Sequence, residues 1–250
     1  MDLLYNVEGG IARLALNRPE KRNALSTALV TGLKAALADS AADESVRVVL
    51  LSGAGKDFCS GADLGDLQKA FDAGVLENMA DAAALGELFL AMRHHPRPIV
   101  AAVRGRALAG GCGLATAADV ILASETARFG YPEVNIGFVP AMVMAILRRS
   151  VSEKRAFDLI TSGATITAQT AWEIGLVTRV LSEETFDLEV EAYVNRLAAQ
   201  PSSSVTLSKQ LLYHMDGMGF EAAIQSGVQM NAIARATDGF REGIERFLKK

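Results

Sequence analysis

Short apolar segments along the first half of the chain predict β-strands. Ile11 to Leu16 alternates as a half-buried strand does, and Asn17-Arg18-Pro19 ends it because proline cannot extend a sheet. Val46 to Ser52 is a short, mostly apolar run and Ile99 to Val103 a wholly apolar one, which is typical of strands buried on both faces. Val120 to Ala123 predicts a further strand of the same kind.

Between these strands, apolar residues recur at the period of a helix. Ser26 is the expected N-cap of a helix whose buried face carries Leu29, Val30, Leu33 and Leu37. Residues 77–93 predict a second amphipathic helix, and Gly110 opens a short third one. Strand, turn and helix thus recur about every 50 residues, which predicts an α/β fold built as a repeating β/α superhelix.

The last part of the chain follows a different pattern. After Leu181 no strand-like run occurs, and residues 183–199, 202–214, 219–236 and 238–250 predict helices. This shift indicates a boundary near residue 190, with a core of residues 1–190 that carries the candidate site and a helical region of residues 191–250. About 60 residues are too few for a separate core, so we expect this region to pack on the core or on another subunit.

Composition and charge exclude several classes of protein. The chain has 250 residues, of which 50% are hydrophobic and 22% charged, as in an ordinary globular enzyme, and its net charge of -4 offers no basic surface for nucleic acid or anionic membrane. No segment approaches the roughly 20 apolar residues of a membrane span. Met1 to Gly10 lacks the features of a signal peptide. We therefore expect a cytoplasmic protein without nucleic-acid or membrane partners.

The cysteines and histidines do not form a recognisable metal site. Cys59 and Cys112 stand alone, away from any histidine at metal-ligand spacing, so we expect reduced thiols, no disulfide and no metal. His94, His95 and His214 lie beside predicted helix ends, where we expect surface or capping residues.

Two glycine turns follow buried strands. Gly110-Gly111-Cys112-Gly113 opens a helix, where backbone N–H groups lack intrahelical partners and the dipole favours negative charge. Ser60-Gly61-Ala62-Asp63 is a second such turn, so N–H donors from both could meet at one oxygen as an oxyanion hole. For one glycine cluster taken alone, tight strand-helix packing explains the sequence equally well. Neither Gly53-Ala54-Gly55-Lys56 nor Gly105 to Gly113 has the spacing of a nucleotide-binding loop.

Glu133 lies among apolar neighbours, including Phe129, Tyr131 and Ile136. Burial raises the pKa of a carboxyl group toward the range that suits proton transfer. Local sequence equally allows Glu133 to cap the helix expected near Pro140 or to pair with an arginine.

Several segments, taken in order, resemble the crotonase superfamily, the enoyl-CoA hydratase/isomerase family. The matching segments are Leu16 to Leu25, Phe58 to Leu64, Ala107 to Ala115, Ala118-Asp119, Phe129 to Glu133 and Ala168 to Leu176. The resemblance implies a spiral of ββα repeats with a C-terminal helical trimerisation region, assembled as a homotrimer or as a hexamer of two trimers. It also implies an acyl-CoA substrate and no separate cofactor, since coenzyme A is part of the substrate.

The resemblance assigns roles to individual residues. The N–H groups of Ala62 and Gly110 would hold the thioester oxygen, and Glu133 would transfer the proton. Phe247 and Lys250 match a C-terminal Phe-x-x-Lys element that reaches the CoA of a neighbouring subunit. The other residues implied in CoA binding are Lys21, Arg22, Asn23, Ala24, Lys56, Ser60, Asp63 and Leu64.

Gly113 leaves the reaction open. Hydratases of this family with two glutamates carry their other carboxylate at this position, and dienoyl-CoA isomerases and aryl-CoA dehalogenases carry an aspartate where this chain has Ala141. Members resembling methylglutaconyl-CoA hydratases also have glycine at the Gly113 position, so the glycine is compatible with hydration, including that of a methylglutaconyl-CoA-like substrate. We slightly prefer hydration of a 2-enoyl-CoA, because it is the broader class. The alternative is a Δ3-Δ2-enoyl-CoA isomerase with Glu133 as sole acid/base. A non-catalytic acyl-CoA- or RNA-binding protein of the same fold is a third reading, which Glu133 and the acidic balance oppose.

Overall fold

The structure, a computed structural model, describes residues 1–69 and 71–249. The strands are β1 (Leu3–Glu8), β2 (Ile11–Leu16), β3 (Val48–Gly53), β4 (Ile99–Val103), β5 (Arg106–Leu108), β6 (Val120–Ser124), β7 (Arg128–Gly130), β8 (Thr165–Thr167) and β9 (Arg179–Leu181). The helices are α1 (Thr27–Ala42), α2 (Leu64–Lys69), α3 (Val75–His94), α4 (Gly110–Thr116), α5 (Ala141–Ser150), α6 (Glu153–Ser162), α7 (Ala168–Glu173), α8 (Phe186–Ala198), α9 (Ser202–His214), α10 (Phe220–Arg235) and α11 (Asp238–Leu248). Short 3₁₀ helices are η1 (Pro19–Lys21), η2 (Pro132–Ile136) and η3 (Met215–Gly217).

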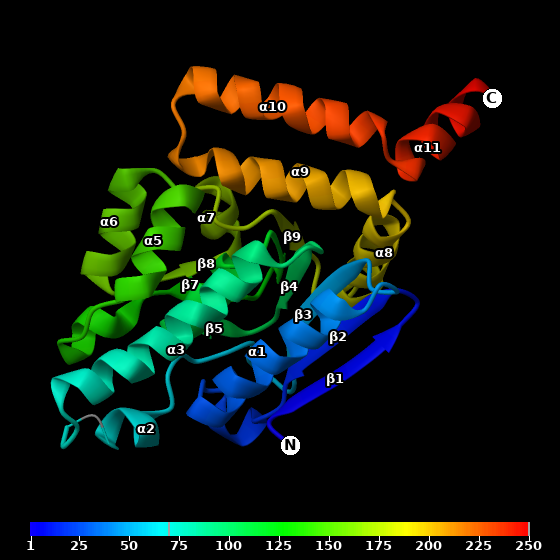
Figure 1. The fold of residues 1–250 in the computed structure, drawn as a ribbon. Helices are drawn as coiled ribbons and strands as arrows, with labels where there is room; N and C mark the ends of the chain where they lie inside the picture. The colour runs from blue at the N-terminus through cyan, green and yellow to red at the C-terminus, as the bar shows by residue number, and fades with distance from the viewer. Residues whose placement is uncertain (70, 250) are drawn as a thin grey trace.

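A six-stranded sheet in the order β1-β2-β3-β4-β6-β9 forms the centre of the molecule (Figure 1). Its strands are parallel except for the antiparallel pair β1 and β2 at one edge. A three-stranded sheet, β5-β7-β8, lies beside it. The predicted α/β class and the four predicted strands are confirmed. The remaining strands escaped prediction because β5, β7, β8 and β9 have three residues each and β1 is mostly exposed.

Both faces of the large sheet are covered, which explains the continuous apolar runs in β3 and β4. One face packs mainly against α1 and α3, and its core includes Leu14, Leu29 and Leu88. The other face packs against α8, which contributes Phe186 and Val194. The predicted boundary near residue 190 falls inside α8, whereas α10 and α11 pack on α9 at the end of the chain (Figure 1).

The predicted helices are present, with shifted ends. Ser26 is the N-cap of α1, and its Oγ accepts a hydrogen bond from the Leu29 N–H at 3.2 Å. The helix predicted over 77–93 spans Val75–His94, and the one predicted over 183–199 begins at Phe186. Among the residues that the structure describes, no helix is both long and apolar enough to cross a membrane.

His95 is buried, so the expectation of a surface position is wrong for this residue, although it does cap the end of α3. Its Nε2 lies 3.1 Å from Ser40 Oγ, and its Nδ1 accepts from the Arg97 N–H at 3.1 Å. Burial lowers the pKa of His95, which keeps the ring neutral inside the fold. His94 and His214 are exposed, as expected.

A buried ion pair attaches α9 to the core. The ammonium group of Lys209 lies 2.8 Å from Asp119 Oδ2, and both side chains are largely buried. The Asp119 carboxylate also accepts from the Ile99 N–H at 2.6 Å and from the Tyr213 hydroxyl at 2.5 Å. This carboxylate therefore links β4 to the first C-terminal helix.

Replacing Asp119 by alanine leaves the Lys209 ammonium buried without its counter-charge. We expect D119A to lose about 3–5 kcal/mol of unfolding free energy, as breaking a buried pair does. Urea denaturation at pH 7 measures the loss. D119A/K209M removes both charges and should recover much of it, while D158N, at an exposed aspartate of α6, is the matched control. A D119A midpoint equal to that of the unchanged protein would contradict the role of the pair.

Candidate active site

The Gly61-Ala62 turn leaves one N–H group free. The Leu25 N–H donates to Gly61 O at 2.8 Å and the Asp63 N–H donates to Leu25 O at 3.0 Å, so these bonds skip Ala62. Within the described part of the chain, the Ala62 N–H has no hydrogen-bond partner, and the residue is exposed. Gly61 has a φ of +101°, a conformation that glycine adopts readily and other residues rarely do.

The second turn places another free N–H beside the first. Ala109 has a φ of +52° and a ψ of -131°, strain that costs an alanine on the order of 1–3 kcal/mol. Its N–H donates to Gly130 O at 2.8 Å, which holds this backbone in place. Gly110 then begins α4, where its N–H has no intrahelical partner. A Cβ on Gly61 would lie 2.7 Å from Ala109 Cβ and 3.5 Å from Gly110 N, so the two turns are in contact.

Ala62 and Gly110 line one small cavity of about 80 Å³. Its walls come from the start of α1, from α2 and from the middle of α3. Two unpartnered N–H groups from separate turns thus border the same space, which is the arrangement that an oxyanion hole requires.

Glu133 is 7% exposed and lies in η2. Its Oε2 is buried and has no hydrogen-bond partner among the described residues. Burial raises the pKa of this carboxyl group. It neither caps the next helix, whose N-cap is Pro140, nor pairs with any described arginine. The carboxyl group is therefore free to exchange a proton with a ligand.

A side-chain contact fixes the start of η2 against α4. The Tyr131 hydroxyl lies 2.8 Å from Thr116 Oγ1, and Tyr131 is fully buried. Thr116 Oγ1 in turn donates to Cys112 O at 2.7 Å. Together with the bond from Ala109 to Gly130, these contacts hold Glu133 in a constant position relative to the Gly110 N–H. Tyr131 and Thr116 were not predicted, because their pairing spans 15 residues and has no local signal.

Gly113 is buried in α4, and neighbouring side chains occupy the space beside it. A Cβ at this position would lie 2.5 Å from Val143 Cγ2 and 3.3 Å from Phe89 Cζ. A larger residue fits only if Val143 moves, since real Cβ atoms do not approach others so closely. The place expected for a second carboxylate is thus filled by apolar atoms from α5 and α3.

The cationic residues expected to bind CoA belong to two loops that contact each other. Lys21, Arg22 and Lys56 are exposed, and a Cβ on Gly55, next to Lys56, would lie 2.8 Å from the Cβ of Pro19, two residues before Lys21. Ser60 is half-buried and donates its N–H to Arg22 O at 3.0 Å, while Leu64 is exposed at the start of α2.

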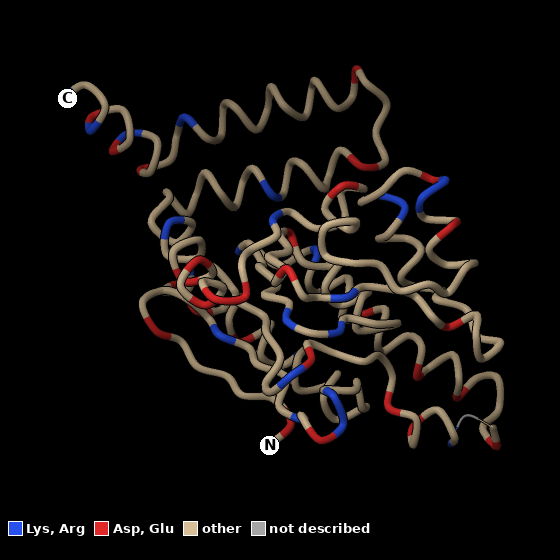
Figure 2. The backbone as a smooth tube through the Cα atoms, turned by 180° about the vertical axis from the view of Figure 1, so that it is seen from behind, with Lys and Arg blue, Asp and Glu red and all other residues tan. Residues whose placement is uncertain are grey.

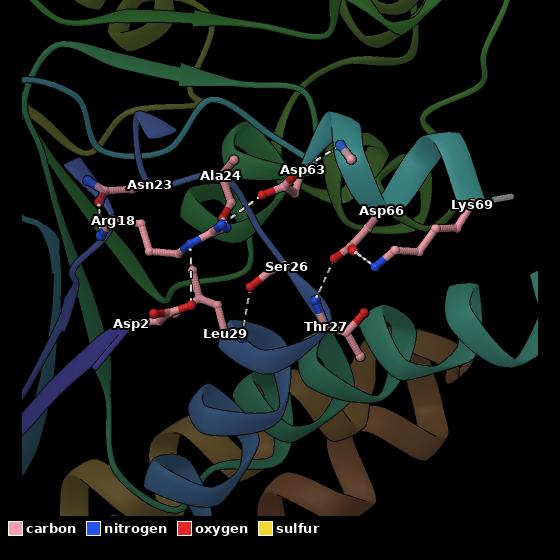
Figure 3. Close-up of polar contacts among 11 residues, drawn as sticks. Asp2, Arg18, Asn23, Ala24, Ser26, Thr27, Leu29, Asp63, Asp66 and Lys69 are labelled. Carbon is pink, nitrogen blue, oxygen red and sulfur yellow. Dashed lines mark hydrogen bonds and ion pairs between the residues drawn. The ribbon is translucent and has the colours of Figure 1, made fainter. Parts of the chain in front are cut away.

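Other residues expected to bind CoA have side chains engaged within the fold (Figure 3). The Asn23 amide is buried and donates to Ala54 O at 2.9 Å and to Asp57 O at 2.7 Å. Arg18 reaches Ala24 O at 2.7 Å and Asp63 Oδ2 at 2.8 Å. Its hydrogen bond is the main cause of the lowered pKa of Asp63. Asn23, Ala24 and Asp63 therefore shape the loop that carries Lys21 and Arg22.

The two residues expected to reach the CoA of a neighbouring subunit belong to the C-terminal end of the chain. Phe247 is 76% exposed on α11, which packs on α9 and α10. Lys250 lies outside the described residues.

The two thiols near the site are unreactive. Cys59 and Cys112 are buried and free, and burial raises their pKa values to about 12 and about 11. Within residues 1–69 and 71–249, no three His, Cys, Asp or Glu side chains gather in a way that could hold a metal ion.

Known proteins are similar to this chain in sequence over almost its full length. Residues 6–250 match the family described as enoyl-CoA hydratase/isomerase. A Thermus thermophilus protein named "putative enoyl-CoA hydratase" is 42% identical over 243 residues, which cover 97% of this chain and 96% of that protein. The 2,3-dehydroadipyl-CoA hydratase of Escherichia coli is 33% identical over 251 residues, with 100% of this chain and 96% of that protein covered.

Solved structures of related proteins have the same fold. An enoyl-CoA hydratase from Mycobacterium smegmatis superposes with a TM-score of 0.95 at 33% identity, covering 100% of this chain and 96% of that one. The expected crotonase-like fold is therefore confirmed, and the chain belongs to the enoyl-CoA hydratase/isomerase family.

Proposed function

We propose that this protein hydrates a 2-enoyl-CoA thioester with Glu133 as its sole acid/base. The observation that carries the proposal is the buried, unpartnered Glu133 oxygen, held by Tyr131 close to the turn that presents the free Gly110 N–H. The names of relatives from Thermus thermophilus and Escherichia coli, both hydratases, support the same reaction.

One carboxyl group is enough for the proton transfers of hydration. Ionised Glu133 takes a proton from water as the water oxygen bonds to Cβ, and the electron pair of the double bond moves onto the thioester oxygen. The N–H groups of Ala62 and Gly110 stabilise this enolate. Glu133 then gives its proton to Cα, so that one water is added and the carboxylate is restored. No redox cofactor takes part in these steps.

The packing around Gly113 favours isomerisation as a second candidate. Val143 fills the space beside Gly113, so no second carboxylate is present there to orient water. In an isomerase, Glu133 would remove a proton from Cα of a 3-enoyl-CoA, and the same amides would hold the dienolate. The proton would return to Cγ, and no water would be consumed.

Exposed cations on loops near the cavity support the binding of coenzyme A. Lys21, Arg22 and Lys56 are exposed cations on neighbouring loops, and they suit the phosphates of coenzyme A. Asn23, Ala24 and Asp63 hold this loop in shape through their hydrogen bonds, and Ser60 and Leu64 flank the Gly61-Ala62-Asp63 segment in the chain.

The C-terminal helices support a homotrimer, alone or paired as a hexamer. Helices α10 and α11 lie beyond α9 at the periphery of the molecule (Figure 1) and expose many large apolar side chains, as interaction surfaces do. These side chains are Phe220, Ile224, Val228, Ile233, Phe240, Ile244, Phe247 and Leu248. In such an assembly Phe247 reaches the CoA of a neighbouring subunit.

RNA binding receives no support from the distribution of charge. Figure 2 shows basic and acidic positions interspersed along the backbone, and the chain has a net charge of -4. Nucleic-acid binding draws on clustered Lys and Arg that neutralise phosphates.

Two thioesters separate the two candidate reactions. With crotonyl-CoA, hydration removes the conjugated double bond, so we expect the absorbance of the conjugated enoyl group to fall. With 3-hexenoyl-CoA, isomerisation creates that conjugation and the absorbance rises. A rise with 3-hexenoyl-CoA and no change with crotonyl-CoA would replace hydratase by isomerase, and no change with either would contradict both.

Glu133→Gln tests the acid/base. We expect kcat to fall by about 10²–10⁴-fold with little change in CoA affinity, because an amide cannot exchange the proton. In the unchanged enzyme, activity should rise with pH as Glu133 ionises, at a pH above the ordinary range of glutamate. Steady-state kinetics from pH 4 to 9 measure both effects, with E44Q at an exposed glutamate as control. Full activity of E133Q would remove Glu133 from the mechanism.

The same variant changes stability in a predictable direction. Because the folded-state pKa of Glu133 is raised, its contribution to stability is fully present below the unfolded pKa and is lost as the pH rises through the folded pKa. Above that pH, E133Q should have the higher Tm, by roughly 1–4 °C, and the difference should disappear in acid. Thermal unfolding across pH 4–9 measures this difference in Tm. A lower Tm of E133Q than of the unchanged protein at pH 8 would contradict the expectation that the buried, ionised Glu133 destabilises the fold.

A further inference from the structure

The cavity that contains the two free N–H groups is lined by acids and by no base. Asp63, Asp66 and Asp81 border it, and no Lys, Arg or His is among its described lining residues. The remaining lining is apolar or carries hydroxyl groups: Leu25, Ser26, Thr27, Val30, Ala62, Leu67, Ala84, Leu85 and Gly110. Its charge is therefore opposite to that of the nearby loops with Lys21, Arg22 and Lys56.

Charge indicates which part of the substrate faces these acids. The phosphates of coenzyme A belong with the cations of the loops that carry Lys21 and Lys56. Figure 3 shows Asn23 and Arg18 on one side of Asp63, with Asp66 and Lys69 on the other. A thioester whose oxygen meets Ala62 and Gly110 thus directs its acyl chain toward α2 and α3.

Two of the three acids are already paired. Asp63 binds the Arg18 guanidinium at 2.8 Å. Asp66 binds the Lys69 ammonium at 2.7 Å and also accepts from the Thr27 N–H at 3.2 Å. These hydrogen bonds lower the pKa values of both aspartates, so both stay ionised.

Asp81 is the acid without a counter-charge. It lies on α3 one turn before Ala84 and Leu85, and its carboxylate has no ion pair or hydrogen bond in the described part of the structure. The acyl end of the cavity therefore carries at least one uncompensated negative charge. A second carboxylate brought to this end meets a like charge, which is unfavourable even where water screens it.

We propose that this protein selects thioesters whose acyl chain is uncharged at its far end, and that Asp81 rejects chains ending in a carboxylate. The inference rests on the proposed function for the position of the thioester. An uncharged chain can pack against Leu67, Ala84 and Leu85 and brings no second negative charge close to Asp81. Hydration of a dicarboxylic thioester is accordingly not the favoured use of this site.

Hexanoyl-CoA and adipoyl-CoA form a matched pair of probes, because both have six acyl carbons and only adipoyl-CoA ends in a carboxylate. We expect calorimetry to show hexanoyl-CoA binding at least about tenfold more tightly at low salt. Asp81→Asn should improve adipoyl-CoA binding roughly fivefold and leave hexanoyl-CoA and free CoA unchanged. Asp158→Asn changes the net charge equally on α6, away from the cavity, and should change neither ligand.

Equal affinity for the two thioesters, or a preference for adipoyl-CoA, would overturn the proposal. So would a D81N variant that keeps the full preference of the unchanged protein. Both probes are saturated, so their binding does not depend on turnover. Failure to convert any enoyl-CoA, together with an intact preference for hexanoyl-CoA, would contradict the proposed reaction and still support the role of Asp81.

Discussion

The site depends on the attachment of α4 to the segment that carries Glu133. The Ala109 N–H donates to Gly130 O at 2.8 Å, and Thr116 Oγ1 meets the Tyr131 hydroxyl at 2.8 Å at the other end of the helix. These contacts join both ends of one short helix to neighbouring residues of the partner segment. The distance between the Gly110 amide and the Glu133 carboxyl group, to which we assign anion stabilisation and proton transfer, is thereby set by the core and not by exposed loops.

Local strain is part of the same arrangement. Ala109 adopts a φ of +52°, which an alanine keeps only where surrounding contacts require it. Gly61 must be glycine because a side chain there would meet Ala109. The two turns therefore support each other, and each presents an N–H group that the fold itself does not use. Glu133 adds a buried carboxyl oxygen, so three polar groups in this region have no hydrogen-bond partner among the described residues.

Much of this could be predicted from the sequence where the signal is local. The β2, β3, β4 and β6 strands, the Ser26 N-cap and both glycine turns follow from patterns a few residues long. Three-residue strands carry too little pattern to be recognised. Relations between distant segments were also missed: the contact of Tyr131 with Thr116, and the position of Asp81 on the same cavity as Ala62. Burial of His95 likewise depends on Ser40, which lies 55 residues away.

The contact between Gly113 and Val143 couples α4 to α5. An acid introduced at position 113 would collide with Val143 unless that side chain moved, and a smaller residue introduced at position 143 alone would leave a cavity beside Gly113. The effects of substitutions at the two positions are therefore not expected to add. A smaller residue at position 143 would make room for a carboxylate at position 113, so the two helices would have to be redesigned as a pair to hold a second acid in the core without strain.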